Sequence, residues 1–344
     1  MVKKSKKSLK NKSISKKSQK LKNKRNKLWY EYNEIIKNKN KKSLNKYFVT
    51  NDLFDFVPKI SKSNSITKFN FPDITIGSVH YDEGPVGCTY IDFKNGARVH
   101  QDLRGGYVAN TTMSSINIDY NVTGICLAGG YTLGLEAIGG CSAEKMKESD
   151  YYYEPITNGA IISSNKFMTP GNMVYADKKL GRFAVKNRKA NFVYNGQVGC
   201  GTMARNGQGV AFKEDKGIKY LVLVINNALG DIYDEKNKCI KKTFSNHKKE
   251  YKISNKTKNR SRNTTLTVLI TNLDLKIELL ESMANQVHSS MGKNIIPFNT
   301  VEDGDILYAC STREIKFPFN SHEFVSVCKE MGKLAEKAVI KSVV

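Results

Sequence analysis

The chain has 344 residues, of which 56 are Lys or Arg and 32 are Asp or Glu, and its formal net charge is +24. With 40% apolar and 26% charged residues it lies in the range of globular proteins, which excludes a wholly disordered chain. No run approaches the roughly 18 consecutive apolar residues of a membrane-spanning helix, which excludes an integral membrane protein. A charge of this size suggests nucleic-acid binding, so its position along the chain matters.

The positive charge is concentrated in two segments rich in Lys, Asn and Ser. Residues 1–46 carry a net charge of +16 and residues 236–262 a net charge of +10, which leaves −2 for the remaining body. Both segments have few apolar residues to offset the conformational entropy lost on ordering. We therefore expect them to be solvated and largely disordered, apart from a short helix around residues 28–36. Nucleic-acid binding would then be confined to the tail at 1–46.

Compartment and metal chemistry are constrained by what the sequence lacks. The tail has no apolar core of a secretory signal, which predicts a cytoplasmic protein, although its Lys clusters would also suit a nuclear address or a solubilising segment. The seven cysteines, an odd number without a CxxC pair, are typical of reduced and buried thiols. The five histidines show no ligand spacing, so we expect neither a metal site nor a cofactor.

From about Phe69 the chain shows strand and helix patterns, and we expect a single domain over residues 47–344. Strands are predicted at 73–80, 87–93, 123–130, 159–164, 219–226, 264–271 and 305–311. Helices are predicted at 134–149, 275–291 and 322–343, the second with Asp274 as its N-cap. Because long strands outnumber crossover helices, an α+β sandwich is favoured over a doubly wound parallel sheet.

The most informative junction lies where the basic segment meets the strand predicted at 264–271. A polar loop of about 27 residues is unusual inside a compact domain, and cleavage between Asn263 and Thr264 would account for it. Thr264 would then carry a free α-amino group, with a reference pKa of about 8, beside its hydroxyl. One residue would supply both nucleophile and base. For an isolated tripeptide, however, Asn-Thr-Thr is more commonly a plain turn into a strand.

Three further groups would complete such a site. Asp303 and Asp305 are two positions apart on a predicted strand, so both carboxylates face one side, where they would shift the proton affinity of Thr264. The Asn206 amide, in a Gly-rich turn, would donate to an oxyanion, and Lys178 would add a positive charge. Taken singly, each has an ordinary explanation, namely an Asp-Gly turn, an Asn-Gly hairpin turn and a surface lysine.

Taken together, eight segments resemble the self-cleaving N-terminal-nucleophile aminopeptidases and amidases, in particular their nylon-oligomer (aminohexanoate-oligomer) endo-hydrolase branch. The segments follow the family's order between about residues 74 and 312: GPVGCTYIDF, DLRGG, ICLAGG with GLEA, GAII with VYADKKLGR, GQVGCGTMARNG, VLVINNALGDIYD, NTTLTVLITN and DGDILYACST. The resemblance implies a four-layer αββα sandwich that cuts itself into residues 47–263 and 264–344. It also implies a small peptide or amide substrate and a homotetramer.

The resemblance assigns a role to each candidate residue. By position these are the nucleophile Thr264, the autocleavage bond Asn263–Thr264, the acidic pair Asp303 and Asp305, the oxyanion amide Asn206 and the site lysine Lys178. The family tyrosine before Gly-Leu-Glu is absent, because Leu133 occupies its position. Tyr131, two residues earlier, either replaces that oxyanion contact or the contact is lost.

Two other functions remain open at this stage. One is a non-catalytic member of the family that contacts nucleic acid through its basic segments. The other is an acyltransferase with similar self-cleaving chemistry, such as the ornithine acetyltransferases. The Leu133 departure favours the first alternative, whereas the combination of Thr264, the acidic pair and the amide favours an enzyme.

Overall fold

The computed structural model describes residues 49–106, 108–111, 121–152, 155–162, 172–243, 263–317 and 320–343. The tail at 1–46, the short helix expected around 28–36 and most of the basic segment lie outside these residues. The chain divides into two units, of which the smaller comprises residues 1–56 and 168–174. In that unit β1 (Val49–Thr50) pairs in parallel with β9 (Asn172–Met173). All further elements belong to the larger unit.

The larger unit is built on two β-sheets that share one long strand, β5 (Val86–Gly105). The first half of β5 pairs with β4 (Ile74–Tyr81) and β7 (Val122–Gly129). Its second half pairs with β17 (Gly304–Lys316). The change of partners falls at Gly96, whose φ of +72° is a conformation that glycine adopts without strain. One strand thereby fixes the position of each sheet relative to the other.

The remaining strands extend both sheets and form two small ones. The first sheet adds, beyond β7 and β4, the strands β8 (Thr157–Ile162), β6 (Asn110–Thr111) and β2 (Lys59–Ile60). The second adds, beyond β17, the strands β15 (Thr264–Asp274), β12 (Ile218–Asn227) and β11 (Gly207–Asp215). The small sheets contain β3 (Ile66–Lys68) with β10 (Phe192–Tyr194), and β13 (Asp231–Tyr233) with β14 (Cys239–Lys241) and β16 (Ile295–Ile296).

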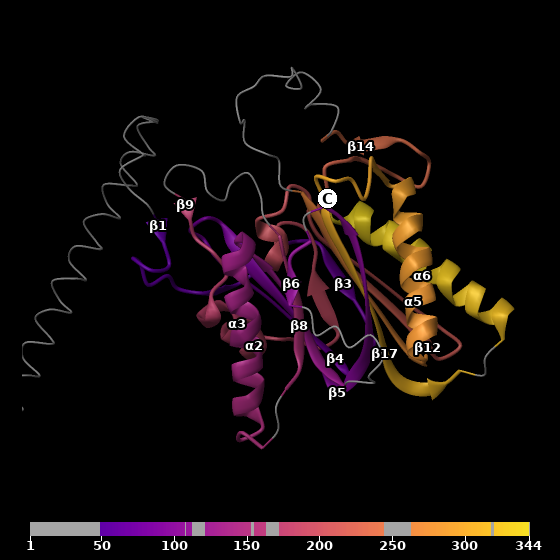
Figure 1. The fold of residues 1–344 in the computed structure, drawn as a ribbon, viewed down its shortest axis with the longest axis horizontal. Coiled ribbons are helices and arrows are strands. Elements are labelled where there is room, and N and C mark those ends of the chain that lie inside the picture. Colours follow the sequence, from indigo (N-terminus) through magenta and orange to yellow (C-terminus); the bar gives the residue numbers. More distant parts are fainter. Residues whose placement is uncertain are drawn as a thin grey trace, which may run out of the picture. The chain divides into compact units, whose positions relative to one another are not determined.

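Helices cover the outer face of each sheet (Figure 1). The first sheet is covered by α2 (Leu135–Glu148) and α3 (Lys178–Lys186), and the second by α5 (Ile277–Ser290) and α6 (Ser321–Lys341). Short 3-10 helices lie at Tyr131–Gly134 (η2), Gly199–Thr202 (η3) and Met291–Lys293 (η4). The order helix, sheet, sheet, helix confirms the predicted four-layer αββα sandwich.

The expected N-cap of the helix over 275–291 is wrong. Helix α5 starts later, after Lys276, and no side chain caps it. Asp274 instead ends β15 and forms an ion pair with Arg98, with 3.0 Å between Oδ1 and Nη1. The helix that was not predicted, α3, does have a side-chain cap, because Asp177 accepts a hydrogen bond from the Leu180 N–H at 2.9 Å.

The start of the basic segment, which as a whole was expected to be solvated and largely disordered, is ordered as far as Thr243. Strand β14 pairs with β13, so its backbone groups are satisfied despite its lysines. Thr243 is buried beyond it, and its N–H donates to Asp231 Oδ1 at 2.5 Å. These hydrogen bonds help to offset the conformational entropy that the segment loses on ordering, which its few apolar residues do not offset.

Strand β15 is buried on both faces, and its many Thr, Val, Leu and Ile residues suit that position. On one face, Leu269 packs in a core with Val222 of β12, Leu307 of β17 and side chains of α5 and α6, among them Met283, Val287, Met331 and Leu334. The other face turns towards the first sheet. There the two sheets are joined by Gln208, whose Oε1 accepts a hydrogen bond from Thr89 Oγ1 at 2.7 Å.

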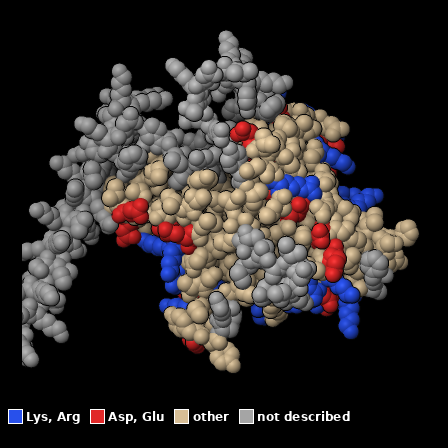
Figure 2. Space-filling model, viewed as in Figure 1, with Lys and Arg blue, Asp and Glu red and all other residues tan. Residues whose placement is uncertain are grey.

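Charge on the described surface is mixed. Figure 2 shows Lys and Arg side chains beside Asp and Glu side chains on the viewed face, in agreement with the charge of −2 outside the two basic segments. Among the described residues, no helix combines the length and the apolar character that crossing a bilayer requires.

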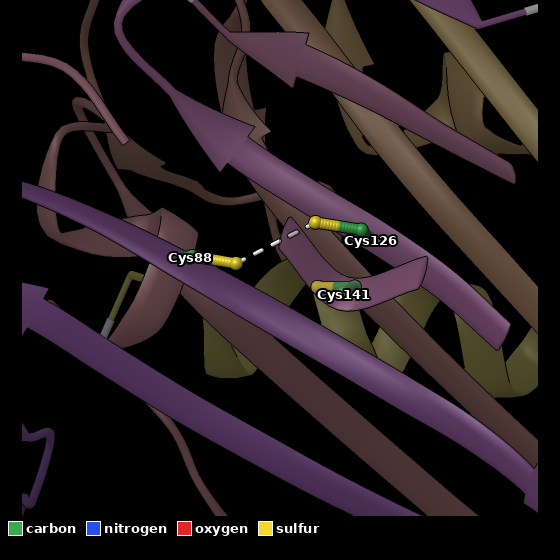
Figure 3. Close-up of side chains that lie close together, drawn as sticks. All are labelled: Cys88, Cys126 and Cys141. Atoms are coloured by element: carbon green, nitrogen blue, oxygen red, sulfur yellow. Dashed lines mark hydrogen bonds between the residues drawn. The ribbon is translucent and has the colours of Figure 1, made fainter. Parts of the chain in front are cut away.

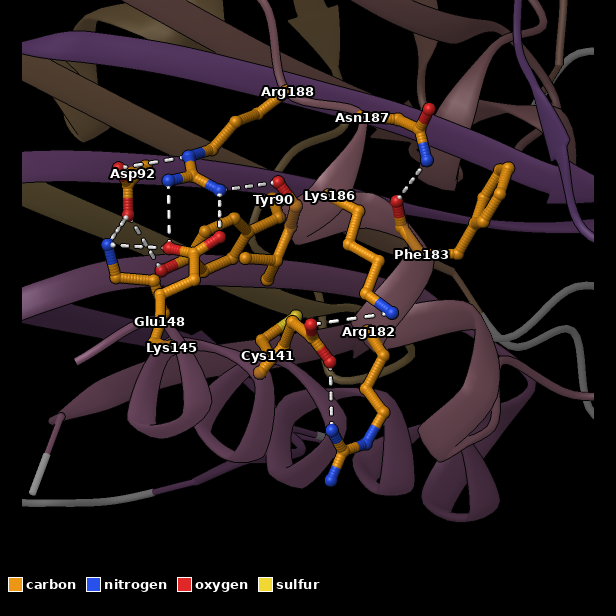
Figure 4. A network of polar contacts seen from close by, with 12 residues as sticks. Tyr90, Asp92, Cys141, Lys145, Glu148, Arg182, Phe183, Lys186, Asn187 and Arg188 are labelled. Carbon is orange, nitrogen blue, oxygen red and sulfur yellow. Dashed lines mark hydrogen bonds and ion pairs between the residues drawn. The ribbon is translucent and has the colours of Figure 1, made fainter. Parts of the chain in front are cut away.

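A buried network of charges fastens α2 and α3 to the first sheet (Figure 4). Asp92, on β5 and 5% exposed, lies 2.9 Å from Lys145 Nζ and 3.2 Å from Arg188 Nε. It also accepts a hydrogen bond from Tyr90 Oη at 3.1 Å, and Glu148 pairs with Arg188 at the rim. Removing one member would leave an uncompensated charge in the interior.

We therefore predict that Asp92→Asn lowers the free energy of unfolding by about 3 kcal/mol, because Lys145 and Arg188 lose their buried counter-charge. Urea unfolding followed by circular dichroism measures this change. The exposed pair of Lys333 with Glu330 supplies the control, since Lys333→Gln should leave the midpoint nearly unchanged. Equal midpoint shifts in both variants would contradict the assignment.

Candidate active site

One end of the second sheet brings the predicted site residues together. Strand β11 starts directly after Asn206, β12 ends at Asn227, and β15 starts with Thr264. Strand β17 starts between Asp303 and Asp305. Neighbouring strands lie about 4.8 Å apart, so the backbone of Asn206 lies about 10 Å from that of Thr264, two strands away.

The carbonyl of Asn263, which belongs to the predicted scissile bond, receives two hydrogen bonds. Thr264 Oγ1 donates to it at 2.5 Å and the Gly304 N–H at 3.0 Å. Asn263 also forms a parallel bridge with Asp303, which continues the pairing of β15 with β17. The carbonyl is therefore polarised by a backbone donor and in contact with the hydroxyl that would attack it. The Gly304 N–H was not identified from sequence, because a backbone donor has no residue signature.

Thr264 and Thr265 are both buried but face opposite sides of the sheet. The odd-numbered residues of β15 face the helices, since Leu269 packs there and Thr267 Oγ1 contacts Met291 Sδ at 3.7 Å. Because side chains alternate along a strand, Thr265 shares that face and Thr264 points between the sheets. Of these two threonines, only Thr264 points into the space between the two sheets, and it is also the first residue of the strand.

Asp305 is fully buried and bonds to backbone near Thr264. Its Oδ1 accepts from the Thr265 N–H at 2.5 Å and its Oδ2 from the Asn299 N–H at 3.2 Å. Burial raises the pKa of Asp305 well above its ordinary value, and the neighbouring Asp303 raises it further. In the continuous chain, the carboxylate therefore orients the start of β15 through the residue after Thr264.

Asp303 holds the other side of the junction. Its Oδ2 accepts from Thr300 Oγ1 at 2.6 Å, and its Oδ1 from the Leu229 N–H at 3.4 Å. Burial raises the pKa of Asp303, and the hydrogen bonds from Thr300 oppose that shift, as does the charge of Arg205. Burial lowers the pKa of Arg205, and Asp303 opposes that shift in turn. Arg205 was missed from sequence; its only signal was a charge directly before Asn206 in a Gly-rich segment.

The Asn206 side chain is 5% exposed and has a fixed orientation. Its Nδ2 donates to Asn226 Oδ1 at 3.0 Å, and Asn226 Nδ2 donates to Ser342 Oγ at 3.0 Å. Ser342 Oγ donates onward to the Val339 carbonyl, so Asn226 can only accept from Asn206. Asn206 keeps a second N–H for another acceptor. The next residue, Gly207, has φ of +120° and supplies the turn into β11.

Lys178 and Tyr131 lie in the other half of the sandwich. Lys178 is the exposed first residue of α3, and no hydrogen bond or ion pair within the described ranges joins it to Thr264. Tyr131 starts η2 after β7, with φ of +57°, and Leu133 is 40% exposed in the same turn. The roles predicted for Lys178 and Tyr131 stay predictions.

Potential metal ligands gather elsewhere. Within the described part of the chain, Cys88, Cys126 and Cys141 form a group of thiols close enough to share one ion (Figure 3). They lie between the first sheet and α2, in a different layer from Thr264. Six of the seven cysteines are buried free thiols, as predicted, and Cys239 is half-buried.

Comparison with known sequences identifies relatives along most of the chain. The sequence pattern of peptidase family S58 matches residues 71–344. Proteins named 6-aminohexanoate-oligomer endohydrolase from Agromyces sp. (strain KY5R) and Paenarthrobacter ureafaciens are each 33% identical over 294 residues. Those alignments cover 78% of this chain and 81% of each relative.

Solved structures share the fold at lower identity. The l-aminopeptidase d-Ala-esterase/amidase of Ochrobactrum anthropi, described as a variant of the Ntn hydrolase fold, superposes with a TM-score of 0.59 at 16% identity, covering 82% of this chain and 88% of that one. The beta-aminopeptidase of Burkholderia sp. gives a TM-score of 0.59 at 13% identity, covering 82% and 89%. The expected fold type is confirmed.

The buried acidic pair predicts how stability depends on pH in the uncleaved variant Thr264→Ala. The folded-state pKa of Asp305 lies above its ordinary 3.8, so the folded chain retains a proton that the unfolded chain loses. The contribution of Asp305 to stability should therefore be fully present below about pH 3.8 and be lost as the pH rises towards the folded-state pKa. Adding Asp305→Asn should reduce that decline, as measured by urea unfolding at several pH values.

The quantity compared is the change in the free energy of unfolding per pH unit, so a uniform change in stability at all pH values does not affect the result. Asp274→Asn, at an exposed carboxylate, serves as the control and should leave the slope as it is. An unchanged slope in Asp305→Asn would show that Asp305 is ionised in the folded chain.

Proposed function

Because the chain belongs to peptidase family S58, we propose that it is an amide hydrolase that cuts its own Asn263–Thr264 bond and then uses Thr264 as an N-terminal nucleophile. Membership of this family, together with relatives that are amide hydrolases, makes the chain a hydrolase acting on amide bonds. The observation that carries the finer proposal is the pair of donors, Thr264 Oγ1 and the Gly304 N–H, on the Asn263 carbonyl oxygen.

Self-cleavage would proceed by an N→O acyl shift. Thr264 Oγ1 turns from the carbonyl oxygen to the carbonyl carbon of Asn263 and attacks it, while the Gly304 N–H stabilises the negative charge that develops on the oxygen. The hydroxyl proton passes to the Thr264 nitrogen as the C–N bond breaks. Water then hydrolyses the resulting ester, leaving a carboxylate on Asn263 and a free amine and hydroxyl on Thr264.

In the mature enzyme the new amine would be the general base. It takes the proton of its own hydroxyl, which attacks the substrate carbonyl and forms an acyl-enzyme ester. Asp303 and Asp305 supply negative charge at the start of β15 and β17, which favours an ammonium formed there. Arg205 limits the repulsion between the two carboxylates, because its charge interacts with Asp303.

Asn206 would stabilise the oxyanion with its remaining N–H. Its first N–H is committed to Asn226, so the amide plane is set before substrate arrives. Such preorganised donors need no reorientation in the transition state. The substrate is proposed to be a short linear amide, since the named relatives act on 6-aminohexanoate oligomers. Lys178 is kept as a candidate for positive charge in the site.

The first test is the mass of the purified protein. Wild type should yield a fragment of residues 264–344, 81 residues long, which starts with Thr264. Thr264→Ser should still be cleaved, because it keeps a hydroxyl, whereas Thr264→Ala should stay intact. Thr265→Ala is the matched control, with a buried hydroxyl on the opposite face, and should be cleaved. A wild-type chain that remains full-length on prolonged incubation would refute the proposal.

The second test addresses the oxyanion contact in cleaved protein. Asn206→Ala should lower kcat by about 10²–10³-fold with little change in KM, since the lost hydrogen bond forms mainly in the transition state. Initial rates on 6-aminohexanoate oligomers and on aminoacyl anilides measure it. Asn187→Ala, at the end of α3, is the control. A raised KM with unchanged kcat would instead assign Asn206 to substrate binding.

A further inference from the structure

Three thiols from distant parts of the sequence meet between the first sheet and helix α2 (Figure 3). Cys88 lies on β5, Cys126 on β7 and Cys141 on α2. The Sγ atoms of Cys88 and Cys126 are 3.5 Å apart, and all three sulfur atoms lie within 4.8 Å of one another. All three side chains are fully buried. We call this group the thiol triad.

These separations suit one metal ion at the centre of the triad. Metal–thiolate bonds are about 2.3 Å long, so three sulfur atoms around one ion in a plane lie about 4.0 Å apart. The 3.5 Å between Cys88 Sγ and Cys126 Sγ is slightly below that value, and all three sulfur atoms lie within 4.8 Å of one another. Small movements of the thiol side chains would therefore complete three bonds.

A disulfide fits the backbone less well. Cys88 pairs in register with Ala128, and Cys126 pairs with Tyr90, so the two cysteines are diagonal neighbours on antiparallel strands. Diagonal neighbours have Cα atoms about 7–8 Å apart. A disulfide needs roughly 4.4–6.8 Å between its Cα atoms. The strands hold the thiols close enough to share an ion but not in the usual position to bond to each other.

The donor set selects the kind of ion. In the part of the chain that the structure describes, the group contains three cysteines and no His, Asp or Glu. A tetrahedral structural zinc site takes four ligands, whereas thiolates alone, at low coordination number, favour a soft ion such as Cu(I). The nearest recorded oxygen partner is the Gly181 carbonyl, which accepts from Cys141 Sγ at 3.4 Å.

We propose that Cys88, Cys126 and Cys141 form a three-coordinate thiolate site for a soft metal ion, with Cu(I) as the ion that fits its geometry. Binding forms three Cu–S bonds and releases three thiol protons, with no change of oxidation state. The ion ties α2 to β5 and β7 and so stabilises this side of the sandwich.

Burial determines how the site would be filled. With no exposed ligand, the ion enters while α2 is not yet packed on the sheet. The experiment therefore uses the full chain, produced in cells supplied with copper and purified without oxygen. Copper per chain is measured by mass spectrometry, and the copper environment by X-ray absorption. We expect one copper per chain, three sulfur neighbours at about 2.3 Å, and a higher unfolding temperature than in copper-free protein.

Single variants locate the site. Cys88→Ala, Cys126→Ala and Cys141→Ala should each reduce bound copper at least tenfold. Cys310→Ala, at a buried free cysteine outside the triad, should retain it. Alanine is preferred to serine because it introduces no unpaired hydroxyl into the core. If a triad variant does not fold, the absorption spectrum of the wild type decides alone.

Three results would overturn the proposal. The first is wild-type protein without copper, both from supplemented cells and after anaerobic titration with Cu(I). The second is copper that survives in all three triad variants, which would place it elsewhere. The third is a disulfide between Cys88 and Cys126 in freshly purified protein. Zinc retained in preference to copper would overturn the assignment of the ion.

Discussion

The hydrogen bond from the Gly304 N–H to the Asn263 carbonyl is the contact on which the candidate site depends. It accompanies a bridge between Asn263 and Asp303 that continues the parallel pairing of β15 with β17 three residues before the first pair of the regular ladder. A slip of one residue would exchange the two faces of β15, and Thr265 would then replace Thr264 on the inner side. The register of two strands thus decides which threonine meets the scissile carbonyl and which carboxylates accompany it.

The two carboxylates show why this register is well defined. A buried ionised carboxylate is costly without hydrogen bonds, and Asp303 and Asp305 obtain theirs from the backbone of Leu229, Thr265, Asn299 and Thr300. These donors come from the loop before β17, from β15 and from the turn after β12. The acidic pair therefore organises three chain segments before any chemistry takes place. Their raised pKa values follow from the same burial.

Much of the fold could be predicted from sequence, for reasons that particular elements illustrate. The strand at 264–271 was found because β-branched and apolar residues dominate it, and the helix at 322–343 because its apolar stripe recurs. The second half of β5 was missed, since its polar residues pair with β17 without an apolar pattern. Strand β14 was taken for disorder because long-range pairing leaves no mark on composition.

The residues of the candidate site were likewise predicted only in part. Residue types and the resemblance identified Thr264, Asp303, Asp305 and Asn206, and these four gather at one sheet end. The Gly304 N–H could not be found, because every residue except proline offers the same group. The thiol triad was not predicted either. Its members are separated by 37 and 14 residues, and only the pairing of β5 with β7 under α2 brings them together.

The two helix layers of the sandwich are held by different physical interactions. Helices α5 and α6 bury an apolar core against the second sheet. Helix α2 instead presents Lys145 and Cys141 to the first sheet, where Asp92 and the other thiols meet them. Burial of apolar surface changes little with pH or bound ions, whereas ion pairs and thiols respond to both. The sheet that carries Thr264 is therefore held to its helices mainly by apolar contacts, whereas α2 meets the opposite sheet partly through an ion pair and thiols that respond to protons and metal ions.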